Sequence, residues 1–75
     1  MILIFDNLKL KDPQIEVVSY SCRPQNKMLI VEVKLFSNNY QHIRSLSDFT
    51  YTDSVSDEMV NELANQWLLD NVQED

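Results

Sequence analysis

Residues 28–36, Met-Leu-Ile-Val-Glu-Val-Lys-Leu-Phe, alternate between two kinds of side chain along their whole length. Such alternation indicates a β-strand, because successive side chains of a strand point to opposite faces. One face of this strand is uniformly apolar, and it comprises Leu29, Val31, Val33 and Leu35. The other face is mixed, and it comprises Met28, Ile30, Glu32, Lys34 and Phe36. A sheet built around this strand has to bury its apolar face against another layer.

Further strands are predicted on both sides of this segment. Ile15–Cys22 and Tyr40–Leu46 are rich in β-branched and aromatic side chains. Ile2–Leu10 is also apolar, and it forms either one strand with a kink at Asp6-Asn7 or two short arms around that pair. Because short loops join these segments, we expect neighbouring strands to pair as an antiparallel meander.

The chain contains no glycine, so no residue can take a positive φ angle without a steric cost. Turns are therefore expected where Pro, Asn and Asp occur, at Asp12-Pro13, Pro24–Lys27 and Ser37–Asn39. The lack of glycine also excludes the glycine-rich loops that bind phosphate groups.

A helix is predicted towards the C-terminus. Ser56 is the expected N-cap, with Ser54 and Asp57 as an alternative frame one turn earlier. The acids Asp57 and Glu58 favour the positive end of a helix dipole. Apolar residues then recur at helical spacing and form one stripe, made of Met59, Val60, Leu63, Ala64, Trp67 and Leu68.

These elements predict a single α+β domain over the 75 residues. We expect a three- to four-stranded antiparallel meander in residues 1–46 and a connection at 47–55. An amphipathic helix at 56–71 packs on one face of the sheet. Acidic side chains oppose the negative end of the helix dipole, so the tail at 72–75 is expected to fray.

One helix of this length is about 21 Å long at ~1.5 Å per residue, so it covers only one face of the sheet. The uniformly apolar face should meet the helix. The mixed face, on the same side of the sheet as Val18 and Tyr20, is then not covered by the helix. Two alternatives stay open for that face. The first strand folds across it in a small sandwich or barrel, or another chain covers it.

The candidate interface follows from the second alternative. It includes the mixed face and the polar side of the helix. It also includes the outward side of the Tyr40–Leu46 strand, which we expect to be a solvated edge face. Its residues are Met28, Ile30, Phe36, Tyr20, Tyr40, Arg44, Glu58 and Glu62.

Catalytic and metal sites are not expected. Cys22 and His42 are the only residues of their kinds, whereas a zinc site needs about four such ligands. Both are expected to have structural roles. The acids near the helix start lack the spacing and the glycine of a calcium loop. We therefore predict a protein that is not an enzyme and binds no metal or cofactor.

The charge is unevenly divided along the chain. Residues 1–44 hold six Lys or Arg against four Asp or Glu, whereas residues 45–75 hold eight acids and no Lys or Arg. The net charge of −6 argues against direct binding of nucleic acid or anionic membranes, which needs clustered cations. The apolar start stops at Asp6, too early for a signal peptide, and a single cysteine suits a reducing compartment. We expect a cytoplasmic location.

Residues 28–70 resemble small uncharacterised proteins of tailed bacteriophages. The likeness rests on Val31–Phe36, Tyr40–Arg44, the acidic and aromatic stretch around Phe49, and Ser56–Glu58 at the helix start. It implies a virion or assembly component, or a small protein that acts against a host, located in the host cytoplasm or the virion. It implies no catalytic residues.

Two functions are consistent with these features. The first is a non-catalytic interaction or assembly module that associates with copies of itself or docks on a larger protein. The second is an acidic mimic of nucleic acid that blocks a basic surface of another protein. In the second case the acids of residues 45–75 provide the mimicry.

Overall fold

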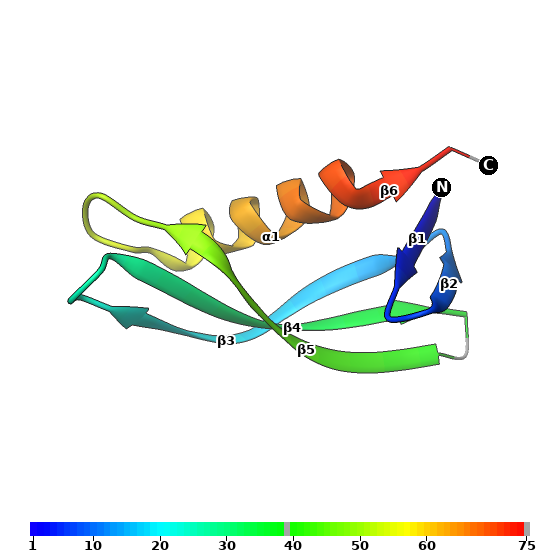
Figure 1. Cartoon of the computed structure of the whole chain (residues 1–75), viewed down its shortest axis with the longest axis horizontal. Coiled ribbons are helices and arrows are strands. Elements are labelled where there is room, and N and C mark those ends of the chain that lie inside the picture. The colour runs from blue at the N-terminus through cyan, green and yellow to red at the C-terminus, as the bar shows by residue number, and fades with distance from the viewer. Residues whose placement is uncertain (39, 75) are drawn as a thin grey trace.

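The structure is a computed structural model that describes residues 1–38 and 40–74. The predicted turn residue Asn39 and the predicted tail residue Asp75 lie outside the described residues. The chain forms two small antiparallel sheets and one helix, so the predicted α+β class is confirmed (Figure 1). The elements in chain order are β1 (Ile2–Phe5), β2 (Leu8–Lys11), β3 (Gln14–Arg23), β4 (Met28–Ser37), β5 (Tyr40–Thr50), α1 (Asp57–Asn71) and β6 (Val72–Gln73).

The larger sheet is the predicted meander, in the order β3-β4-β5. Burial alternates residue by residue along β4, as the sequence pattern predicts. The apolar face of this strand is completely buried, and it contributes Leu29, Val31, Val33 and Leu35. Burying each such side chain stabilises the fold by about 1.5–3 kcal/mol, so β4 is the centre of the core.

Helix α1 begins and ends close to the predicted residues. The Ser56 side chain caps it by accepting a hydrogen bond from the Met59 backbone N–H at 3.2 Å. Val60, Ala64 and Leu68 are buried, which confirms the predicted apolar stripe. The helix lies along one face of the meander, as expected (Figure 1).

The first segment of the chain forms two short arms rather than one kinked strand. Phe5 pairs with Leu8, and the two residues between them, Asp6 and Asn7, have φ angles of 52° and 67°. Positive φ at both central positions is the type I′ turn, which suits the twist of a two-residue hairpin. Asp and Asn thus take the place that glycine usually fills.

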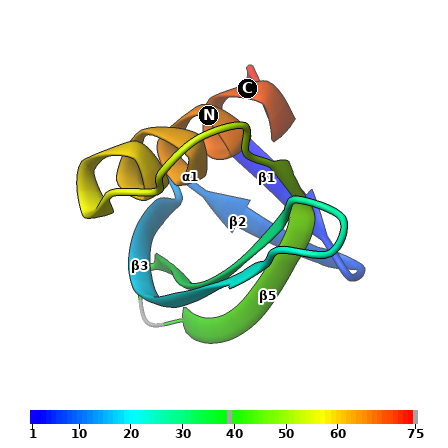
Figure 2. The same cartoon turned by 90° about the vertical axis from the view of Figure 1, so that its left-hand side faces the viewer.

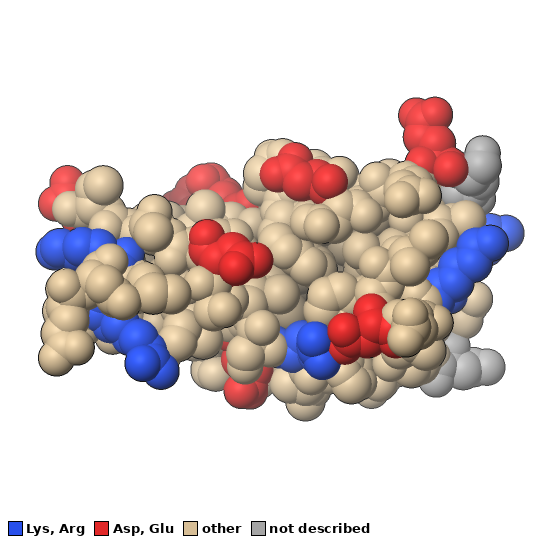
Figure 3. Space-filling view, in the orientation of Figure 1, with Lys and Arg blue, Asp and Glu red and all other residues tan. Residues whose placement is uncertain are grey.

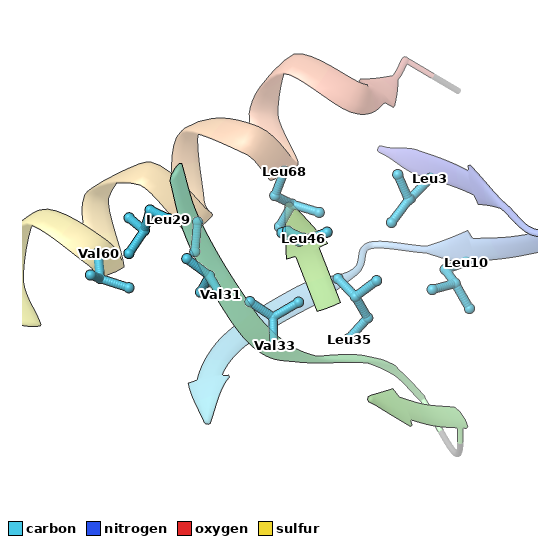
Figure 4. Close-up of a cluster of buried hydrophobic side chains, with 10 residues drawn as sticks. Leu3, Leu10, Leu29, Val31, Val33, Leu35, Leu46, Val60 and Leu68 are labelled. Carbon is cyan, nitrogen blue, oxygen red and sulfur yellow. The ribbon is translucent and has the colours of Figure 1, made fainter. Parts of the chain in front are cut away.

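The β1–β2 hairpin lies on the same side of the meander as the helix (Figures 1 and 2). Leu3 and Leu10 belong to the same buried cluster as Leu35 and Leu68 (Figure 4). A single core therefore lies between the meander on one side and the helix with the small sheet on the other. The alternative in which the first strand covers the mixed face of the meander is wrong.

Two other boundaries differ from those predicted. Strand β5 continues past Leu46 to Thr50, and a register shift opposite Ile30 accommodates Ser47 and Asp48. After the helix, Val72 and Gln73 pair with β1 and complete the sheet order β2-β1-β6. The pairing of Leu3 with Val72 holds residues that were expected to fray.

Candidate functional site

One face of the meander carries no other layer among residues 1–38 and 40–74. The helix and the β1–β2 hairpin both lie on the opposite side (Figures 1 and 2). The side chains of β4 that point away from the core are partly exposed. We call this surface the outer face. Its central row on β4 comprises Met28, Ile30, Glu32, Lys34 and Phe36.

Strands β3 and β5 flank the middle of this row with small polar side chains and its two ends with longer ones, such as Arg23 opposite Met28 and Gln14 opposite Phe36. Ser19 lies opposite Glu32 and Ser21 lies opposite Ile30 on β3, and Ser45 lies opposite Glu32 on β5. Glu16 lies opposite Lys34, within reach of an opposite-charge pair across the strands. The outer face is therefore a row of long side chains, flanked by short side chains beside Ile30 and Glu32 and by longer ones beside Lys34 and Phe36.

Ile43 adds an exposed apolar side chain to the outer face. It lies opposite Lys34 on β5 and is 57% exposed. Ile43 is not among the predicted interface residues. The signal was present, because alternation along Tyr40–Leu46 puts Ile43 on the side away from Tyr40 and Arg44.

Tyr20 does not lie on the outer face, so its predicted position beside Met28 and Ile30 is wrong. Val17 pairs with Val33 and Ser19 pairs with Glu32, which leaves Val18 as an extra residue without an opposite partner. This β-bulge shifts the alternation of β3 by one residue. Tyr20 therefore points to the core side, opposite Val31.

Tyr40 and Arg44 were expected on a solvated edge face of the last strand, and this expectation is also wrong. Arg44 lies opposite the buried Val33. Its guanidinium group is 4.7 Å from the centre of the Phe5 ring and 2.6 Å from Asp6 Oδ2. Tyr40 packs against the core and stacks on His42. Arg44 thus fastens the β1–β2 hairpin to the meander.

Glu58 and Glu62 are exposed on the side of α1 that faces away from the sheet. The helix contains no Lys or Arg. In the view of Figure 3, basic side chains lie at the two ends of the molecule and over the sheet, and none lies over the helix. The outward side of the helix is thus an acidic surface, as the sequence predicts.

A shallow cleft of about 280 Å³ lies between the bulge of β3 and the start of α1. The Tyr20 hydroxyl group donates a hydrogen bond of 2.7 Å to Asp57 Oδ1 there. This hydrogen bond, followed by desolvation and the charge of Asp57, raises the pKa of Tyr20 above the ordinary value of 10.0. The phenol therefore stays protonated at neutral pH, and its hydrogen bond to Asp57 joins strand β3 to helix α1.

This hydrogen bond predicts a pH dependence. Tyr20 is neutral in the folded and unfolded chain below pH 10.0, so the bond contributes its full stability there. The contribution is lost as the pH rises through the higher pKa of the folded state. Subtracting the ultraviolet titration of a Tyr20→Phe variant from that of the wild type should give one tyrosine with a midpoint above 10.0. Asp57→Asn should move that midpoint down, and a wild-type midpoint at or below 10.0 would contradict the assignment.

Structural roles were expected for His42 and Cys22. The His42 side chain is partly buried and stacks on Tyr40, which agrees with such a role. Cys22 is an exposed free thiol on β3, so its setting does not bear out the expected role. Within the described part of the chain, no group of three or more His, Cys, Asp or Glu side chains could hold a metal ion. No described helix has the length and apolar character needed to cross a membrane.

Comparison of the chain with protein-family models, curated proteins and solved structures finds no match. Function is therefore inferred from the surfaces described above.

Proposed function

We propose that this chain is a small, non-catalytic assembly module that associates with copies of itself through the outer face. The observation that carries the proposal is the outward position of Met28, Ile30 and Phe36 on the central strand of a sheet whose other face is already covered. An antiparallel sheet with one face in water usually presents polar side chains on that face. Here apolar residues lie at both ends of the exposed row.

Energetic considerations favour a partner. A domain of this size has a small core, and its stability is limited accordingly. Covering a further Ile or Phe side chain is worth up to about 1.5–3 kcal/mol. A few such side chains, buried together, are enough for reversible association. Assembly through this face also suits a virion or assembly component, the role implied by the resemblance to small tailed-bacteriophage proteins.

Sedimentation velocity tests this proposal. We expect the wild-type mass to rise from monomer towards dimer across the micromolar range. Phe36→Ser and Ile30→Ser remove apolar area from the outer face but leave the core side of β4 unchanged. Each should weaken association about tenfold, which corresponds to ~1.4 kcal/mol. Circular dichroism checks that each variant is folded.

The matched control reverses charges elsewhere, with Glu58→Lys and Glu62→Lys on the outward side of the helix. This variant should associate as well as the wild type. A wild-type chain that stays monomeric at every concentration would overturn self-association. Equal association of all variants would overturn the role of the outer face.

The alternative function is an acidic mimic of nucleic acid that occupies a basic surface of another protein. What favours it is the exposed position of Glu58 and Glu62 on a helix without any cation. The two proposals assign the partner to opposite sides of the molecule. In this alternative the charge reversals at Glu58 and Glu62 abolish binding to a basic partner, and the outer-face variants leave it unchanged.

A further inference from the structure

We infer that the outer face binds the outer face of a second copy, face to face, about a two-fold axis that passes over β4 at the level of Val33. This inference rests on the proposed function and adds the partner and its register. The axis lies between the two sheets and runs perpendicular to the strands. It therefore brings each position on β4 opposite the position equally far from Val33 on the other side.

The order of side chains along the central row fits this symmetry. From one end to the other, the row reads apolar, apolar, acid, base, apolar. Under the proposed axis, Glu32 of each copy faces Lys34 of the other, so two opposite-charge pairs form at the centre. Ile30 of each copy then faces Phe36 of the other, which places an apolar contact on either side of the charges. The row is complementary to itself when reversed.

The other simple two-fold arrangement places like charges together. If the axis ran along β4, each residue would face its own copy, so that Glu32 would meet Glu32 and Lys34 would meet Lys34. Like charges at a desolvated contact are unfavourable. The charge order on β4 therefore selects the reversed arrangement over the parallel one.

The flanking strands leave room for close approach beside Ile30 and Glu32. Ser19 and Ser21 on β3 and Ser45 on β5 lie beside the central row. Their short side chains allow the long β4 side chains of the second copy to approach the sheet, as packed sheets require at a spacing of about 10 Å. Lys34 also bends towards its neighbour, with Nζ 5.8 Å from the centre of the Phe36 ring. The ammonium group thus lies among the residues that form the contact.

The size of the face limits the strength of the dimer. Ten-residue strands are roughly 33 Å long, and three strands are roughly 14 Å wide, so each copy offers on the order of 450 Å² in plan. Two copies together cover on the order of 900 Å², below the ~1,200 Å² at which stable specific interfaces begin. Association should therefore be weak and reversible. Because buried ion pairs gain little net free energy, Glu32 and Lys34 fix the register more than they add strength.

A charge-exchange experiment tests the register. Glu32→Lys gives a chain with two central bases, and Lys34→Glu gives a chain with two central acids. Each variant alone should dimerise at least about tenfold more weakly than the wild type, because like charges then face one another. An equimolar mixture should form a 1:1 heterodimer, since both facing pairs are again opposite in charge. Labelling one variant with heavy nitrogen lets native mass spectrometry distinguish the heterodimer from either homodimer.

The control pair carries the same changes of charge on surfaces away from the outer face. Glu58→Lys lies on the helix and Lys9→Glu lies on the β1–β2 hairpin. These two variants should each dimerise like the wild type, and their mixture should show no preference for the heterodimer. Circular dichroism and urea midpoints confirm that every variant is folded, including Lys34→Glu, whose new acid lies opposite Glu16.

The outcomes separate this inference from the proposed function. Homodimers of both charge variants that are weaker than the wild-type dimer, together with a heterodimer in their mixture and none favoured in the control, support the reversed register. A heterodimer without weaker homodimers would also fit the parallel arrangement and would overturn the reversed one. If Phe36→Ser weakens the dimer but the two central charge variants each dimerise normally, the outer face is the interface and the inferred register is wrong. If the wild type is monomeric throughout, the proposed function and this inference both fail.

Discussion

Leu35→Ala should lower the free energy of unfolding by about 3–5 kcal/mol, which is most of the stability that a domain of this size has. Leu35 is completely buried. It lies where β4 meets the β1–β2 hairpin, close to Leu3 and Leu10 (Figure 4). Truncation would leave a cavity between two layers, and neither can collapse without breaking its own strand pairing. Urea denaturation followed by the fluorescence of Trp67, the single tryptophan, measures the loss.

Ile30→Ala is the matched control on the same strand. Ile30 is only partly buried, and it points to the outer face. At protein concentrations that keep the chain monomeric, its truncation should cost less than about 1 kcal/mol. A cost close to that of Leu35→Ala would mean that Ile30 packs in a core within its own chain, and the outer face would no longer be a free surface.

The contrast between these two residues could be predicted from the sequence because β4 has an unbroken alternation. The same holds for α1, where Ser56 and the apolar spacing of Val60 and Leu68 determine the cap and the buried stripe. In both elements the local pattern and the tertiary packing agree. Where they agree, the sequence is sufficient to identify which side is buried.

The side of the sheet to which Tyr20 points could not be predicted in this way. Along Val17-Val18-Ser19 the sequence alternates no better with a bulge than without one, because two adjacent valines fit either phase. A bulge of one residue exchanges the faces of everything beyond it. The candidate interface therefore included a tyrosine that the structure directs towards the core and Asp57.

Arg44 shows a second limit. The polar residues His42 and Arg44 favour exposure of their side of the strand, whereas Tyr40 and Leu46 on the same side favour burial, so the local pattern does not decide. The contacts that allow Arg44 to lie on the core side come from the other end of the chain, where Phe5 and Asp6 lie against its guanidinium group. Contacts between segments so distant in sequence depend on the placement of the β1–β2 hairpin, which local patterns do not specify.

Leu3→Ala tests that placement directly. Leu3 is the buried centre of the small sheet, paired with Leu10 on one side and Val72 on the other. If the hairpin belongs to the core of its own chain, the substitution should lower the free energy of unfolding by about 2–4 kcal/mol. The adjacent residue Ile4 is 57% exposed and points the opposite way, so Ile4→Ala should change stability by less than about 0.5 kcal/mol.

The concentration dependence of this loss distinguishes two placements of the hairpin. A hairpin that packs on its own meander makes the cost of Leu3→Ala the same in dilute and concentrated protein. A hairpin exchanged with a second copy would make that cost grow with concentration, because Leu3 would then stabilise only the associated form. We expect no such growth. In an exchanged hairpin, the pairing of β1 with β6 and the contacts of Arg44 with Phe5 and Asp6 would have to form between two copies.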